Sequence, residues 1–143
     1  MSQRFRNLHL NRRAIAYGCL ADIGASIAAT ILVGMIAAAT SPDAASLQST
    51  SQSGGIVAIR FILLLGATAL GGYVAARISP RAELTNALGV GVVMTAMSVF
   101  GSVFVSNSQL SLLGALGLLL TLPSAMIGGL LRLSQLEQSA ATS

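Results

Sequence analysis

The sequence predicts an all-α, polytopic membrane protein, a four-transmembrane-helix bundle that forms a single membrane domain. Of its 143 residues, 54% are apolar and only 8% are charged. Soluble domains carry about 25% charged residues, so the charged residues here are too few to cover a water-facing surface. The apolar residues also gather into four segments, each near the ~20 residues that a helix needs to cross a ~30 Å hydrocarbon core.

The apolar segments and the residues between them divide the chain into spans, connections and ends. We expect a basic N-terminal arm at 1–13, spans at about 14–39, 56–78, 84–105 and 110–133, and a polar, frayed tail at 134–143. The first segment is much longer than the ~7–15 apolar residues of a cleavable signal peptide, so we interpret it as an uncleaved helix. The segments lack the alternation of barrel strands. Turn-forming residues mark the three connections: Ser41-Pro42-Asp43 through Gly54-Gly55, Ser79-Pro80-Arg81, and Ser106-Asn107-Ser108-Gln109.

The cationic residues set a direction for the bundle. All eight are arginines, and seven of them flank the expected spans on one side: Arg4, Arg6, Arg12, Arg13, Arg77, Arg81 and Arg132. Cytoplasmic loops are enriched in such residues, so we expect a multi-pass protein of the cell membrane with both termini in the cytoplasm. Arg60, near the outer end of the second span, is the exception. Because the arginines flank spans, they indicate contact with the lipid bilayer and no nucleic-acid partner.

Small residues recur at helical spacing within the spans, where they permit two helices to approach closely in lipid. The expected packing residues are Gly24 and Ala28 in the first span, Ala67, Gly71 and Ala75 in the second, Gly91 in the third and Gly128 in the fourth. These stripes either pack the chain's own bundle or form an interface with a second copy or another membrane protein. Both readings remain open at this stage.

Asp22 is the one acidic residue inside an expected span, about 12 Å from the inner boundary by helical rise. An unpaired aspartate near the bilayer centre costs about 3 kcal/mol on insertion scales, so we expect it to be protonated, paired or facing a polar crevice. Tyr73 and Arg77 are the expected intramembrane partners by depth, and Arg60 lies farther away. The functional reading is a proton or cation site, and the alternative is a structural hydrogen bond between the first two spans.

Part of the sequence resembles a group of small, uncharacterised bacterial membrane proteins. The resemblance rests on GGYVAARISPRAEL at 71–84, ALGVG at 87–91 and the Asp-centred ADIG at 21–24. Covering spans one to three, it implies a four-helix fold in the bacterial inner membrane and supplies no activity.

Two functions remain after the motifs have been searched. One Cys (Cys19) and one His (His9) build no metal cluster, and no nucleophile triad or phosphate loop occurs, so we expect neither an enzyme nor a cofactor. The composition favours a non-enzymatic membrane protein that packs with itself or with partner proteins. The alternative is a small transporter or proton-coupled carrier that uses Asp22.

Overall fold

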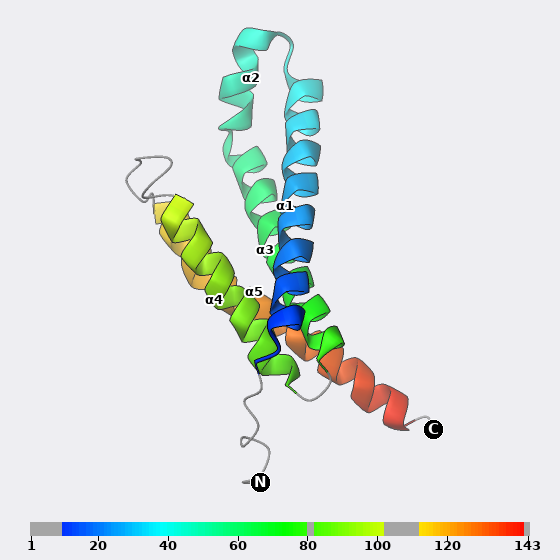
Figure 1. Ribbon diagram of the computed structural model, residues 1–143. Helices are drawn as coiled ribbons and strands as arrows, with labels where there is room; N and C mark the ends of the chain where they lie inside the picture. Colours follow the sequence, from blue (N-terminus) through cyan, green and yellow to red (C-terminus); the bar gives the residue numbers. More distant parts are fainter. Residues whose placement is uncertain (1–9, 80–81, 102–111, 142–143) are drawn as a thin grey trace.

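The computed structural model describes residues 10–79, 82–101 and 112–141, and in these residues the chain is helical, without strands (Figure 1). The helices are α1 (Arg12–Thr40), α2 (Ala44–Ser51), α3 (Gly54–Ile78), α4 (Glu83–Phe100) and α5 (Leu112–Ala141). All except α2 are long and apolar enough to cross a membrane. The prediction of an all-α chain with four membrane-spanning helices is therefore confirmed.

The connection between the first two spans contains a helix that the sequence analysis placed in a loop. α2 begins after Asp43, whose carboxylate accepts a hydrogen bond of 2.7 Å from the backbone N–H of Ser46. The Ser46 hydroxyl lies 3.3 Å from the backbone N–H of Asp43 and accepts its hydrogen bond, which completes a capping box. This local pairing satisfies two N–H groups that a helix start leaves free.

The last helix also differs from the prediction. α5 continues to Ala141, so the part of the expected frayed tail that the structure describes is helical. Pro123 lies inside this helix. Some of the predicted features lie outside the described residues. These are residues 1–9 of the basic arm, the turn at Pro80 and Arg81, the loop at 106–109 with the adjoining ends of spans three and four, and residues 142–143.

The long helices form two hairpins that cross. α1 and α3 run side by side and are joined through α2, while α4 and α5 form a second pair that lies obliquely against them (Figure 1). α3 is central, since it packs against α1, α4 and α5. α1 begins and α5 ends at the end of the molecule opposite α2 (Figure 1). We call these two ends of the molecule the α2 end and the basal end.

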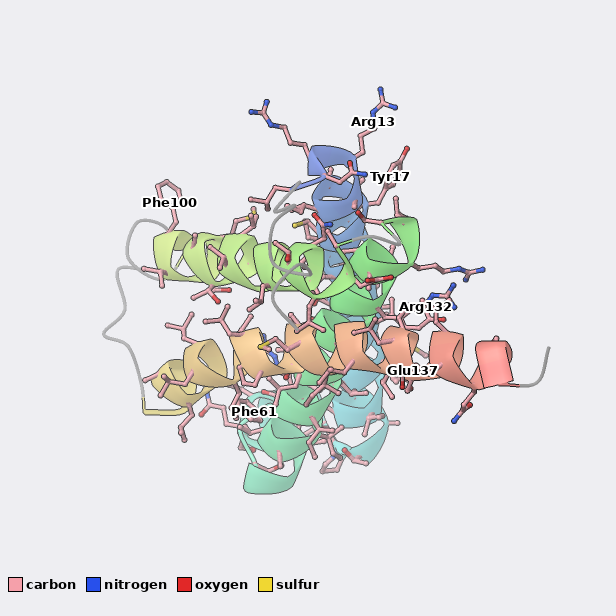
Figure 2. The ribbon with its side chains drawn as sticks, turned by 90° about the horizontal axis from the view of Figure 1, so that it is seen from below. Arg13, Tyr17, Phe61, Phe100, Arg132 and Glu137 are labelled. Carbon is pink, nitrogen blue, oxygen red and sulfur yellow. The ribbon has the colours of Figure 1, made fainter. Side chains whose placement is uncertain are left out.

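The interior of the bundle is built from small side chains and the exterior from large ones. Alanine dominates the buried apolar residues: Ala14, Val33, Ala37, Ala67, Ala75, Ala76, Ala87, Val90 and Ala125. Large apolar side chains are exposed on every long helix, for example Met35, Ile62, Met97 and Leu119. Figure 2 shows the side chains of Tyr17 and Phe100 directed outward from their helices. This distribution suits lipid as the solvent, because lipid is as apolar as leucine and close packing replaces the hydrophobic drive.

Glycines place the backbone of α3 directly against its neighbours. On the α1 side, a Cβ added to Gly18 would lie 2.8 Å from the carbonyl oxygen of Gly71. On the α5 side, a Cβ added to Gly72 would collide with the carbonyl oxygen of Ala125, and one added to Gly128 with that of Ala69. No larger residue fits at these crossings without moving a helix, so they fix how closely the hairpins approach.

The predicted packing residues of spans two to four lie inside the bundle, whereas those of span one do not. Ala67, Gly71 and Ala75 are buried on α3, Gly91 faces Ala125 of α5, and Gly128 meets α3. Gly24 and Ala28 are exposed, and a Cβ at Gly24 would meet nothing within 4 Å. These two residues therefore do not pack α1 within the chain, and for them only the second reading, an interface with a second copy or another membrane protein, stays open. α1 instead packs through a face offset by half a turn, which includes Ala14, Gly18 and Asp22.

Gly72 and Gly24 offer a matched test of this packing. We expect Gly72→Leu to lower the free energy of unfolding by about 1–3 kcal/mol, because the new side chain forces α3 away from α5. Gly24→Leu is the control, since its side chain would extend into open space, and it should leave the stability unchanged. Thermal unfolding in mild detergent measures both, and an equal loss in the two variants would contradict the crossing.

Candidate functional site

Two large polar side chains are fully buried in an interior that otherwise consists mostly of small residues. The largest fully buried side chains are Val90, Asn86 and Asp22. Asp22 is only 1% exposed and Asn86 is fully enclosed. Polar groups are costly to bury in lipid unless they are satisfied, and they mark functional positions when they persist there. The surroundings of these two residues therefore identify the candidate site.

Asp22 lies on the face of α1 that meets α3, and hydroxyl groups surround one of its oxygens. The Ser26 hydroxyl, one turn later on α1, donates to Asp22 Oδ1 over 3.3 Å. The Thr68 hydroxyl of α3 donates to the same oxygen over 3.4 Å and also to the carbonyl of Leu64 over 3.3 Å. Both bonds to the carboxyl are longer than the ~2.7–2.8 Å typical of O–H···O bonds.

The second carboxyl oxygen has no hydrogen-bond partner in the part of the chain that the structure describes. Asp22 Oδ2 is buried, and none of the described residues offers it a hydrogen bond. Gly71 allows the carboxyl group to lie this deep. A Cβ added to Gly71 would lie 2.9 Å from the Cβ of Asp22, so a larger residue at position 71 would crowd the aspartate. The crossing thus holds a carboxyl group between two helices while leaving half of it unsatisfied.

The structure does not bring the predicted partners to Asp22. Tyr73 donates its hydroxyl to Gln135 Oε1 of α5 over 2.9 Å. Arg60 and Arg77 are both exposed, and within the described residues neither pairs with the carboxylate. The expectation that Tyr73 or Arg77 partners Asp22 is therefore wrong, and Arg60, which was expected to lie farther away, does not pair with it either. Tyr73 follows Gly71, which lies against Asp22, by only two residues. The Tyr73 side chain nevertheless points toward α5, because it leaves α3 on another side.

The actual partners, Ser26 and Thr68, were missed, although the sequence contained a signal for each. Ser26 follows Asp22 by four residues, and residues four apart share a helix face. Thr68 precedes Gly71 by three residues, so it shares the small-residue face that the sequence analysis assigned to packing. A hydroxyl beside a glycine on a contact face indicates a polar contact as well as a close approach.

Asn86 joins the start of α1 to α4. Its Oδ1 accepts a 2.9 Å hydrogen bond from the backbone N–H of Asn11, the N-cap of α1. Its Nδ2 donates to the carbonyl of Ala82 over 2.9 Å. The Asn11 side chain in turn accepts from the backbone N–H of Arg13 over 3.1 Å. These bonds have ordinary lengths, and both ends of the Asn86 amide are satisfied.

Comparison of the chain with family models, with curated proteins and with solved structures finds no match. The resemblance to small bacterial membrane proteins therefore stays a prediction.

The two polar sites should respond differently to loss of their hydrogen bonds. We expect Asn86→Leu to lower the free energy of unfolding by about 1–3 kcal/mol, because it leaves the partly buried N–H of Asn11 without its acceptor. Thr68→Val should cost less than about 1 kcal/mol, since inter-helix hydrogen bonds in membranes average about 0.6 kcal/mol and this one is long. Unfolding in detergent compares the variants. A larger loss for Thr68→Val would show that the Asp22 contact holds the bundle together.

Proposed function

We propose that this chain is a small proton-coupled carrier of the bacterial inner membrane and that Asp22 binds the proton. In the proposed orientation both termini lie in the cytoplasm, so the basal end faces inward and the α2 end faces outward. The exposed Arg13 and the half-buried Arg132 support this orientation, because they belong to the basal ends of α1 and α5.

The observation that carries the proposal is the burial of a carboxyl group without a cationic partner. Asp22 is 1% exposed, and among the described residues the hydrogen bonds to its carboxyl group come from hydroxyl groups alone. An ionised aspartate at this depth costs about 3 kcal/mol on insertion scales. Binding a proton removes that cost, and releasing it requires a polar surrounding. A buried carboxyl group therefore takes up or releases its proton when its surroundings change between apolar and polar.

A purely structural role accounts poorly for this arrangement. The two hydrogen bonds that the described residues donate to Asp22 are long, and Oδ2 receives none from them. The contact between α1 and α3 is made instead by Gly18 and Gly71, which need no carboxyl group. A serine or alanine at position 22 would fit the same crossing at lower cost, so the carboxyl is best explained by its chemistry.

A proton fits the site better than a metal ion. Among the described residues, three side chains supply oxygen atoms at this site, namely Asp22, Ser26 and Thr68, whereas a hard cation such as Ca²⁺ takes about 6–8 oxygen ligands. In a protonated Asp22, Oδ1 would accept from the two hydroxyls and Oδ2 would carry the hydrogen. Because Oδ2 is buried, this O–H would reach the Ser26 hydroxyl by rotation of the carboxyl group about its Cβ–Cγ bond.

Proton uptake by reconstituted protein tests the proposal. Proteoliposomes are given an inward proton gradient, potassium with valinomycin balances the charge, and an internal pH dye is followed. We expect Asp22→Asn to abolish the protein-dependent acidification, because an amide cannot exchange a proton in this way. Asp43→Asn, which changes the cap of α2, is the matched control and should acidify like the unmodified chain. Equal rates for Asp22→Asn and the unmodified chain would overturn the proposal.

A second candidate function is assembly with other membrane helices. Gly24 and Ala28 lie four residues apart on α1, are exposed, and form a small-residue face that the bundle does not use. Faces of this kind permit close helix association in lipid. Non-enzymatic packing with a second copy or with a partner protein would use this face of α1.

Energy transfer between two labelled populations of the protein in vesicles measures self-association. We expect Gly24→Leu to reduce the transfer if α1 pairs with α1 through this face, because the leucine separates the helices. Gly34→Leu is a suitable control, since Gly34 is also exposed with nothing within 4 Å of an added Cβ, but on another side of α1. Transfer that is absent in the unmodified protein, or that both variants retain, would contradict self-assembly through Gly24.

A further inference from the structure

The surroundings of Asp22 differ between its two sides along α1. Toward the α2 end, the residues one and two turns later are Ser26 and Thr30, which we call the hydroxyl column. Ser26 donates to Asp22 Oδ1, and Thr30 donates its hydroxyl to the carbonyl oxygen of Ser26 over 2.8 Å. Exposure rises along the column, from buried Asp22 through half-buried Ser26 to exposed Thr30. Thr30 lies about 12 Å along the helix from Asp22.

Toward the basal end, close apolar packing replaces the hydroxyl groups. Gly18, one turn before Asp22, is buried, and a Cβ there would lie 2.6 Å from Val90 Cγ2 and 2.9 Å from Ala75 Cβ. Ala14, a further turn back, has no exposed surface. This layer separates Asp22 from the polar contact between Asn11 and Asn86, so no hydrogen-bonding side chain on this face of α1 links the two.

The arrangement of the hairpins agrees with this asymmetry. α1 touches α4 near its basal end, where Ile15 lies beside Gly89 and Gly18 beside Val90. Beyond these contacts α1 and α4 diverge toward the α2 end (Figure 1). The side of Asp22 that carries the hydroxyl column is thus also the side on which the second hairpin moves away.

We infer that Asp22 exchanges its proton with the α2 side of the membrane by way of Ser26 and Thr30, while the Gly18 layer closes the basal side. The inference rests on the proposed function and specifies its sidedness. The Thr30 hydroxyl donates to the carbonyl oxygen of Ser26 and not to the Ser26 hydroxyl, so the relay needs a water molecule between the two side chains. Hydroxyl groups and water can both donate and accept, as a proton relay requires. The other titratable or charged groups near Asp22 do not replace Ser26 and Thr30 in this proton exchange. Cys19 lies one turn earlier on α1, and α3 faces the carboxyl group with Thr68. Arg60 and Arg77 are exposed.

Thiol accessibility tests the sidedness directly. Cys19 is the only cysteine, so Cys19→Ser provides the background. Into it are placed, singly, Thr30→Cys, Ser26→Cys and, as a matched control, Ala28→Cys, which is exposed on the same helix but away from the hydroxyl column. A further variant, Leu47→Cys in exposed α2, marks which side of the vesicle the α2 end occupies. A charged, impermeant methanethiosulfonate is then added from each side in turn.

We expect Thr30→Cys to react from the same side as Leu47→Cys, at least about tenfold faster than Ala28→Cys, because only a thiolate in water attacks the reagent. Ser26→Cys should react from that side more slowly. Reaction of Thr30→Cys from the opposite side, or at the rate of Ala28→Cys, would overturn the inference. Since Leu47→Cys defines the reference side, an inverted orientation of the protein would not affect this conclusion.

Proton uptake by the same variants separates the sidedness from the proposed function. Modification of Thr30→Cys should slow acidification at least about tenfold, and modification of Ala28→Cys should not, because only the first blocks the relay. Normal uptake after complete modification of Thr30→Cys would overturn the route while leaving Asp22 as the proton-binding group. If Asp22→Asn and the unmodified chain acidify at the same rate, the proposed carrier function is overturned, and the inference is overturned with it.

Discussion

The close approach of α3 to its neighbours is the constraint on which the rest of this structure depends. Lipid gives helices no hydrophobic reason to associate, so the bundle gains its stability from backbone-to-backbone contact and van der Waals packing. Gly18 and Gly71 provide that contact on one side of α3, and Gly72 and Gly128 on the other. With α3 fixed in this way, the two hairpins have a common element and cross around it.

The same constraint explains why the polar residues stand out. An interior of alanine and glycine encloses few large side chains, and two of the three largest that it fully buries are Asn86 and Asp22. Asn86 satisfies both ends of its amide and ties the start of α1 to α4. Among the described residues, Asp22 has two long hydrogen bonds to one oxygen and none to the other. The contrast between a satisfied and a half-satisfied group separates the structural role from the proposed chemical one.

Much of the candidate site could be predicted from the sequence, but its contacts could not. Asp22 was recognised because charge inside an apolar span is rare, and its depth followed from helical rise. Its partners depend on rotation around each helix axis, and here the rotation turns Tyr73 toward Gln135 and Thr68 toward Asp22. A difference of five positions along α3 separates the predicted partner from the observed one. Depth alone does not distinguish them, because tilted helices bring residues of several levels together.

The sequence by itself determined the class of protein, the four spans and the helices' boundaries to within a few residues at most ends, because length and apolarity are local properties. The helical structure of α2 and of the C-terminal part of α5 was not predicted, because both are polar segments that resemble loops. Only the tertiary structure decided which face of α1 packs: Gly24 and Ala28 stay exposed, and Gly18 and Asp22 enter the crossing. The physical reason is that these helices are apolar on all sides. Contact with lipid therefore does not select a face, and steric fit between whole helices does.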